Sequence, residues 1–381
     1  IKYFRDAKIT LEFKNEEIDL IEFYLKFDKR RSRSNIIDSV ADYFTRNSSN
    51  DFYIIKVGLK YLIKLVKQLT TLIEEYGPGA SGTIHHTFEK MQEIMQQGIF
   101  QYTAQLNENK LNFMQVNKLD QAFRGKQKEN VRMLLDMVYE LDIFENLALI
   151  STKLNLSFAD YDSSDKMKVS LKGLFHLTMA QPVKNDIEFE QDKNLIFLSG
   201  SNMAGKSSLL KSLGLVIYLA QLGFPVPADR MKTTLFNGLI TTINLPDNMG
   251  EGLSHYYSEV KRVKEVSLKL LEADKLFIIF DELFRGTNVK DAFDASLLIL
   301  SELTHIKDSA FFISTHIVEL AAELAKFNNI SFSYLETYFE NQKPVFTYKL
   351  MQGISKERLG MYIVLNEGIV EILKKAVVKK C

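Results

Sequence analysis

The chain has 381 residues, 46% of them hydrophobic and 25% charged, so it is long enough for two or three domains and apolar enough to bury a core. Lysine plus arginine and aspartate plus glutamate each total 48, and the first 170 residues are balanced as well, which excludes a global basic field drawing the chain onto nucleic acid or an anionic membrane. The only cysteine, Cys381, excludes an internal disulfide framework and a thiolate zinc site and favours a reducing cytoplasm, and no apolar run approaches the roughly 20 residues that span a bilayer, so we expect no membrane partner.

Residues 1–164 are expected to form an all-helical domain. Apolar residues recur there at steps of three and four, which is the pattern of amphipathic helices. The segments with this pattern are Glu16–Phe27, Asn35–Phe44, Phe52–Tyr76, Thr87–Gln105 and Lys118–Leu154. The polar stretch Asn155–Asp165 then predicts a boundary, so that a second domain spans residues 165–381.

Short apolar runs alternate with helical segments after residue 165, which predicts βα units and a mainly parallel sheet with flanking helices. Leu195–Leu198, Leu276–Phe280 and Ala310–Ser314 are apolar almost throughout, as strands covered on both faces are. The last stretch predicts a strand at Val345–Leu350 and a closing helix whose final lysines suit a helix C-terminus.

The turn after the first of these strands has the spacing of a phosphate-binding loop. Residues 200–207 are Gly-Ser-Asn-Met-Ala-Gly-Lys-Ser, which matches G-x-x-x-x-G-K-[ST] between a strand and the helical run Ser208–Leu222. The glycines let backbone N–H groups point at phosphate oxygens, and the helix adds its positive end. Lys206 is expected to reach the β- and γ-phosphates of ATP, and Ser207 to bind Mg²⁺. A glycine-rich turn without a ligand is the alternative.

Two carboxylates end the strand Leu276–Phe280. Asp281 is expected beside Mg²⁺, and Glu282 is expected to orient and polarise an attacking water. Small-molecule kinases do not need a water-activating glutamate, so the pair favours a hydrolase; an acidic pair that only caps the strand is the alternative. His316, just past another buried strand, can hydrogen-bond the γ-phosphate.

Two further residues complete an arrangement typical of ABC-type ATPases. Gln221 is expected to sense Mg²⁺ or water, although glutamine is common at helix ends. Ser254 is either a plain N-cap or a signature serine that contacts nucleotide bound by a partner subunit. The predicted catalytic residues are Glu282, His316 and Lys206. The predicted ATP-binding residues are Gly200, Ser201, Asn202, Met203, Ala204, Gly205, Lys206, Ser207, Ser208, Gln221 and Asp281, with Ser207 and Asp281 as the metal-binding pair.

The sequence from about Glu145 to Leu365 resembles the MutS family of mismatch-repair ATPases. The resemblance is carried by Val183–Ile187, Gly200–Ser208, Gln221–Ala228, Asp281–Asn288, Ser314–His316 and Tyr348–Leu350. Asn202-Met203 in the phosphate loop and Arg285-Gly286-Thr287 after the acidic pair set this family apart from other ABC-type ATPases. Three residues depart from its pattern: Ala204 and Phe284 where glycine is usual, and His255 where threonine is usual. Phe284 is expected to crowd a loop at the dimer interface, which makes the hydrolysis rate harder to predict than nucleotide binding.

The resemblance implies an α/β P-loop NTPase domain of ABC type over residues 165–381, ending in a helical dimerisation segment and preceded by an all-α core or lever domain. It implies ATP and Mg²⁺ as ligands, and a homodimer with composite sites in which Ser254 acts on nucleotide held by the other subunit. It further implies a cytoplasmic, DNA-dependent ATPase that opens and closes on mismatched, branched or otherwise non-standard double-stranded DNA in mismatch repair or recombination, with other repair proteins as partners.

The sequence is compatible with direct contact to DNA and with its absence. A Phe-x-Glu mismatch reader is not expected, because the only such spacing, Phe280-Asp281-Glu282, belongs to the acidic strand. The stripe Lys56, Lys60, Lys64 and Lys67 and the cations among Lys26–Arg33 can neutralise phosphates, but they equally fit a solvated surface. The alternatives are a nucleotide-switched scaffold that binds repair proteins without touching DNA, and a membrane-associated transporter ATPase, which the MutS-like motifs disfavour.

Overall fold

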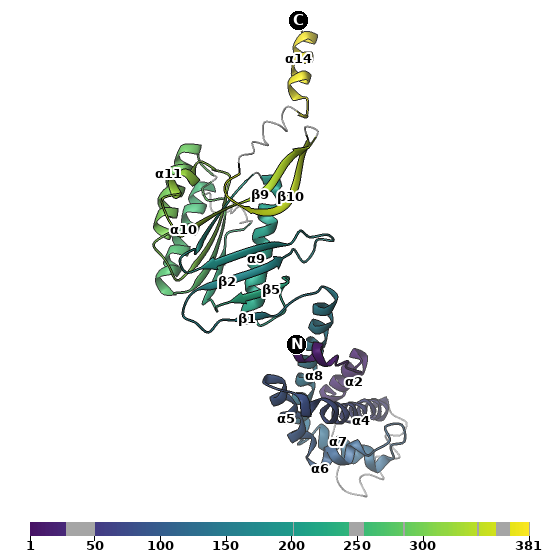
Figure 1. Ribbon diagram of the computed structural model, residues 1–381. Helices are drawn as coiled ribbons and strands as arrows, with labels where there is room; N and C mark the ends of the chain where they lie inside the picture. Colours follow the sequence, from purple (N-terminus) through teal and green to yellow (C-terminus); the bar gives the residue numbers. More distant parts are fainter. Residues whose placement is uncertain are drawn as a thin grey trace. The chain divides into compact units, whose positions relative to one another are not determined.

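The computed structural model describes residues 1–27, 50–200, 202–243, 255–284, 286–340, 343–355 and 366–380 (Figure 1). The chain divides into two compact units, Ile1–Ile150 and Ser151–Cys381. The boundary predicted from the sequence, after residue 164, lies later in the chain. The second unit begins earlier because β1 (Ala159–Tyr161) already pairs in parallel with β5 (Arg230–Thr233).

Every regular element described in the first unit is a helix. These helices are α1 (Lys2–Ala7), α2 (Asn15–Lys26), α4 (Asn50–Tyr76), α5 (Thr83–Met95), α6 (Gly98–Ala104), α7 (Phe113–Phe123) and α8 (Lys128–Lys153), with a short 3-10 turn at Gly77–Gly79. The segments Thr87–Gln105 and Lys118–Leu154, predicted as single helices, each contain a break. The extended backbone of Gln97 separates α5 from α6, and a turn at residues 124–127 separates α7 from α8. The predicted helix Asn35–Phe44 and the cations Lys29–Arg33 lie outside the described residues.

The helices of the first unit pack around Tyr24 and the middle of α4. Tyr24 is fully buried, and a Cβ added at Gly58 of α4 would lie 2.3 Å from the Tyr24 Cβ, so α2 and α4 approach closely only because residue 58 is glycine. The Tyr24 hydroxyl donates to Asp120 at 3.1 Å, and Asp120 forms a buried ion pair with Arg124. This core therefore joins α2, α4 and α7.

The second unit contains the mainly parallel sheet that the sequence predicts. Its strand order is β10-β9-β4-β8-β7-β6, and all neighbours are parallel except the β9–β10 hairpin. The strands are β4 (Leu195–Ser199), β6 (Gly238–Thr241), β7 (Leu276–Asp281), β8 (Ala310–Thr315), β9 (Ile330–Glu340) and β10 (Lys343–Gln352). A second sheet was not predicted: β1, β5, β2 (Lys168–Leu174) and β3 (Asn185–Glu190) form a four-stranded, mostly antiparallel sheet.

Helices cover both faces of the six-stranded sheet (Figure 1). Alternate side chains of β4 show the two layers: Ile196 and Leu198 pack with α9 (Lys206–Gln221) and the smaller sheet, whereas Leu195 and Phe197 face the other core. That other core contains α10 (His255–Glu272), α11 (Val289–Leu303) and α12 (Leu320–Leu324), and a last helix, α14, spans Ile369–Lys380. None of the helices in the described ranges combines the length and the hydropathy needed to cross a membrane. The carboxyl ends of β4, β7 and β8 meet at one edge of the sheet, where the predicted site residues follow.

Candidate active site

The loop between β4 and α9 has the backbone that a phosphate cradle needs. Gly200 has φ 138° and Gly205 has φ 94°, values that L side chains rarely adopt, and a 3-10 turn at Asn202–Ala204 lies between them. A Cβ at Gly200 would meet nothing within 4 Å, so the conformation rather than crowding requires glycine there. Gly205 is the N-cap residue of α9, which aims the N-terminal end of the helix at the loop.

Lys206 carries a buried positive charge at the start of α9. Its side chain is 2% exposed, and its Nζ donates to the carbonyl of Gly200 and lies 4.0 Å from Oε1 of Glu282. Burial lowers the pKa of Lys206, and the attraction of Glu282 and Asp281 only partly offsets that effect. An additional anion would stabilise this ammonium, so the loop is suited to hold phosphate.

Asp281 links the loop to two strands. The Ser207 hydroxyl donates to Oδ2 of Asp281 at 3.2 Å, and the Ser314 hydroxyl, at the end of β8, donates to Oδ1 at 2.7 Å. The backbone N–H of Asp281 donates to Oγ1 of Thr242 at 3.1 Å, just past β6. A hydroxyl and a carboxylate oxygen therefore lie together at the phosphate loop, and both are oxygen ligands of the kind that Mg²⁺ prefers.

Glu282 lies between two basic groups. Its Oε1 is 3.7 Å from Nδ1 of His316 and 4.0 Å from Nζ of Lys206, and its side chain is 14% exposed. The residue adopts a left-handed backbone, with φ 57°, and its N–H donates to the Ser314 carbonyl at 3.0 Å. The carboxylate is thus held beside the loop rather than turned to solvent, which suits a group that orients a water molecule.

A pocket of about 480 Å³ adjoins the loop, and its walls combine predicted ATP-binding residues, such as Ser207 and Ser208, with residues to which the sequence assigned no role. The ring of Tyr348 forms one wall: a Cβ at Gly205 would lie 3.0 Å from its Cδ1. Tyr348 has φ 57° at a register shift between β9 and β10, where the buried Asn185 donates to its carbonyl at 2.9 Å and accepts from the N–H of Leu350 at 2.7 Å. Asn185 and Tyr348 are 163 residues apart, so spacing along the chain could not have revealed the pocket.

The sequence model of MutS domain V matches residues 196–380, a range that contains the phosphate loop, both acidic residues and His316. The chain belongs to the MutS family. The P-loop ATPase fold of that family agrees with the mixed α/β architecture of the second unit.

Curated MutS-family relatives match over longer stretches. The DNA mismatch repair protein MutS of Petrotoga mobilis is 24% identical over 300 residues, which cover 77% of this chain and 36% of that protein. The Endonuclease MutS2 of Streptococcus equi subsp. equi is 33% identical over 220 residues, or 56% of this chain and 27% of that protein. The DNA mismatch repair protein MutS of Lactobacillus gasseri is 26% identical over 261 residues, or 64% and 30%. The chain spans about a third of the length of these relatives. An alignment over 77% of the chain extends into the helical unit, because the second unit holds less than two thirds of the residues.

Most of the predicted MutS-type site residues in the described ranges come together. Ser208 lies in the first turn of α9, and Met203 and Ala204 lie in the 3-10 turn of the loop. Ser201 and Ser254 fall outside the described residues, as does the side chain of Asn202.

Gln221 is not brought to the site. It is the last residue of the 16-residue helix α9, which places it roughly 22 Å from Lys206 at 1.5 Å per residue. Its Oε1 accepts from the N–H of Phe236 at 3.2 Å, so it fixes the loop before β6. Gln221 lies between the phosphate loop and the acidic strand in the sequence, but it does not lie between them in the folded unit.

The departures from the MutS pattern are accommodated inside the unit. Ala204 is 1% exposed and packs into the core around α9. Phe284 is 3% exposed and contacts Tyr256 of α10, with ring centroids 5.9 Å apart, so its ring packs into the unit's own core. Crowding of a loop at a dimer interface by this residue stays a prediction. The side chain of His255 lies outside the described residues.

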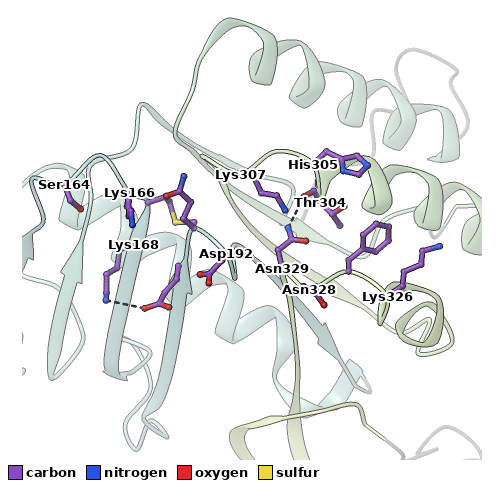
Figure 2. A pocket seen from close by; sticks show the side chains of 14 residues that line it. Ser164, Lys166, Lys168, Asp192, Thr304, His305, Lys307, Lys326, Asn328 and Asn329 are labelled. Carbon is purple, nitrogen blue, oxygen red and sulfur yellow. Dashed lines mark hydrogen bonds and ion pairs between the residues drawn. The ribbon is translucent and has the colours of Figure 1, made fainter.

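A larger cavity, of about 890 Å³, lies near the N-terminal ends of β4, β8 and β9, and Figure 2 shows the side chains that line it. Its walls come from the loops that precede β2, β4, β8 and β9, and none of its lining residues is a predicted site residue. Lys168 pairs with Glu190 at 3.3 Å, and Lys307 and Lys326 follow the C-terminal ends of α11 and α12, where cations offset the helix dipole. At its base, Asn329 donates to Asn194 at 2.8 Å and to the Thr304 carbonyl at 3.0 Å. Lys168, Glu190 and Asn329 of its lining are thus engaged with other parts of the chain.

Among the described residues there is no group of three or more His, Cys, Asp or Glu side chains arranged to hold a metal ion. A Mg²⁺ ion held by one or two protein oxygens together with nucleotide phosphates does not need such a group.

Proposed function

We propose that this MutS-family chain binds ATP with Mg²⁺ and hydrolyses the γ-phosphate. The observation that carries the proposal is the hydrogen bond from Ser207 to Asp281, which joins the phosphate loop to the acidic strand. The same junction holds Lys206 and Glu282 4.0 Å apart, so a cation for phosphate and a carboxylate for water lie side by side.

The residues present fit both ligands by their chemistry. The two glycines with positive φ open the backbone of the loop for phosphate, and burial lowers the pKa of the Lys206 ammonium, an effect that a bound phosphate would oppose. Ser207 and Asp281 would hold Mg²⁺, which when bound supplies positive charge against the phosphate oxygens. The pocket beside Tyr348 lies within the size range of small-molecule sites and would take the nucleoside.

In the proposed reaction the chain positions water and stabilises charge. The Glu282 carboxylate accepts a hydrogen bond from the attacking water and orients it toward the γ-phosphorus. Water adds there as the bond to the β,γ-bridging oxygen breaks, which yields ADP, inorganic phosphate and a proton. Lys206 and His316, 4.0 and 3.7 Å from Glu282, are the basic groups available to stabilise the phosphate oxygens.

Hydrolysis would drive the opening and closing of a homodimer on mismatched, branched or otherwise non-standard DNA, in mismatch repair or recombination. The relatives named DNA mismatch repair protein MutS and Endonuclease MutS2 support this role. The alignment that reaches the helical unit supports a core or lever role for that unit. Two lysines of its stripe already have partners: Lys64 pairs with Glu17 and Lys67 with Glu108, each at 2.7 Å. Lys56 and Lys60 are therefore the members of the stripe that we expect to contact phosphates.

Nucleotide binding is tested by removing the buried cation. Lys206→Ala should abolish ATP binding in an equilibrium titration, because the phosphate charge loses its nearest ammonium. Lys211→Ala, an exposed lysine on the same helix, is the matched control and should bind as the wild type does. Wild-type affinity in Lys206→Ala would overturn the phosphate-loop assignment.

Direct action on DNA is tested by gel shift with mismatched, branched and plain duplexes, with and without ATP, at two salt concentrations. A complex that weakens steeply with salt supports phosphate contact by this chain. ATP binding without any DNA complex would instead support a nucleotide-switched scaffold for partner proteins.

A further inference from the structure

The loop that follows the acidic strand is held in an unusual conformation. Glu282 has φ 57° and Phe284 has φ 59°, both in the left-handed region that side chains with a Cβ disfavour by about 1–2 kcal/mol each. Such strain persists only where the surroundings fix the backbone, and it concentrates at functional sites. The contacts that fix this loop therefore decide where the Glu282 carboxylate lies.

One of those contacts comes from β8 and two come from α10. The N–H of Glu282 donates to the Ser314 carbonyl at 3.0 Å. The buried Phe284 ring packs against Tyr256, in the first turn of α10, with centroids 5.9 Å apart. The N–H of Gly286 donates to Oε2 of Glu259, one turn further along α10, at 3.3 Å. The start of α10 thus contacts the loop at Phe284 and at Gly286.

The same helix also reaches the other side of the acidic strand. Nη2 of Arg262 lies 3.5 Å from the carbonyl of Thr241, at the end of β6. The next residue, Thr242, accepts the backbone N–H of Asp281 at 3.1 Å. Asp281 is therefore connected to α10 through Thr241 and Thr242, and Glu282 is connected to it through the loop that contains Phe284.

We infer that the first two turns of α10 position Glu282, through the contact of Tyr256 with Phe284 and the hydrogen bond of Glu259 to Gly286. This inference rests on the proposed function and adds positioning residues to it. Tyr256, Glu259 and Phe284 are positioning residues: they act on the reaction only through Glu282.

The test separates positioning from nucleotide binding. In Tyr256→Leu, which removes the ring contact, kcat for ATP should fall about tenfold to a hundredfold, because a small misplacement of a reacting group has effects of that size. The dissociation constant for ATP should stay near the wild-type value, since the phosphate loop is untouched. Tyr256→Phe keeps the ring and should restore kcat, and Tyr218→Leu, an exposed tyrosine on α9, is the control for tyrosine loss in general. Unchanged kcat in Tyr256→Leu, or loss of ATP binding together with kcat, would overturn the inference.

A second readout does not depend on turnover. Amide hydrogen exchange over residues 282–288 in the nucleotide-free protein should be faster in Tyr256→Leu and in Glu259→Ala than in the wild type or Tyr256→Phe. Equal exchange in all four proteins would refute the positioning role of α10, whatever the ATPase rate. If the wild type shows no ATP turnover but the two variants still exchange faster, the proposed function is refuted. The contact between α10 and the loop would then still be supported.

Discussion

Lys206 keeps a positive charge where solvent hardly reaches it, with only 2% of its side chain exposed. Desolvation lowers the pKa of its ammonium more than Glu282 and Asp281 raise it, so the charged form is disfavoured in the folded, nucleotide-free protein. Burial of this charge therefore lowers the stability of the nucleotide-free protein, and perturbed pKa values of this kind concentrate at functional sites.

Replacement of this ammonium should stabilise the nucleotide-free protein. The unfolded chain holds the Lys206 proton more tightly than the folded chain does, so this group makes the free energy of unfolding rise as pH rises through the lowered pKa toward 10.5. Lys206→Met should therefore unfold at a higher temperature than the wild type at neutral pH, and the difference should narrow as pH approaches 10.5. Thermal unfolding over a pH series measures both trends. A variant less stable than the wild type at neutral pH would contradict the pKa argument.

Tyr348 is the residue that sequence reasoning left without a role. Its ring borders the pocket beside Gly205, where a nucleobase would stack on it. Tyr348→Ala should weaken ATP binding about tenfold to a hundredfold, which is the usual effect of losing one stacked base contact, whereas Tyr348→Phe should bind normally. Tyr338→Ala, an exposed tyrosine of β9 outside the pocket, is the matched control. Equal ATP affinities for all of these proteins would show that the nucleobase does not bind in this pocket.

Among the elements, α2 and α4 show how one small residue permits close packing. Gly58 lets the α4 backbone touch Tyr24, whose hydroxyl connects onward to Asp120 and Arg124. The contact is tight because the added Cβ would meet the first side-chain carbons of Tyr24, which cannot swing aside as the end of a flexible side chain can.

Gly58→Ala should lower the free energy of unfolding by about 1–3 kcal/mol, the usual effect of an overpacked core. Gly98→Ala is the control: Gly98 starts α6, and a Cβ there would meet nothing within 4 Å, so this change should be neutral or slightly stabilising. Denaturant unfolding of the full chain gives both values. Equal stability of the two variants would show that α2 and α4 can separate without loss.

The elements that could be predicted are those with one dominant signal. Leu195–Leu198 and Ala310–Ser314 are apolar almost throughout, because strands in the middle of a covered sheet face apolar layers on both sides. The smaller sheet was not predicted, although β3 alternates buried and exposed residues as half-buried strands do. Its neighbours β1 and β5 have only three and four residues, which is too short for a clear pattern. The phosphate loop and acidic pair follow local rules of spacing, whereas the placement of Gln221 and Tyr348 depends on helix length and on strand pairing far along the chain.

At the scale of the whole molecule, a neutral chain must bind polyanions through local arrangements. Lysine plus arginine and aspartate plus glutamate both total 48, so neither ATP nor DNA is attracted by a general field. In the described part of the second unit, the N-terminal end of α9, the buried Lys206 ammonium and the Ser207–Asp281 pair lie together at the loop where we propose that ATP binds. The helical unit has no counterpart of comparable density among its described residues, since half of its lysine stripe is paired with carboxylates.

The central claim is that Glu282 prepares water for attack on a phosphate held by Lys206 and the loop. It is tested most directly by phosphate release from Glu282→Gln and wild type, both saturated with ATP and Mg²⁺, with the ATP dissociation constant measured on the same preparations. We expect the variant to bind ATP as the wild type does and to lose roughly a hundredfold or more of its turnover, the effect of removing a general base. Turnover equal to that of the wild type would contradict the account.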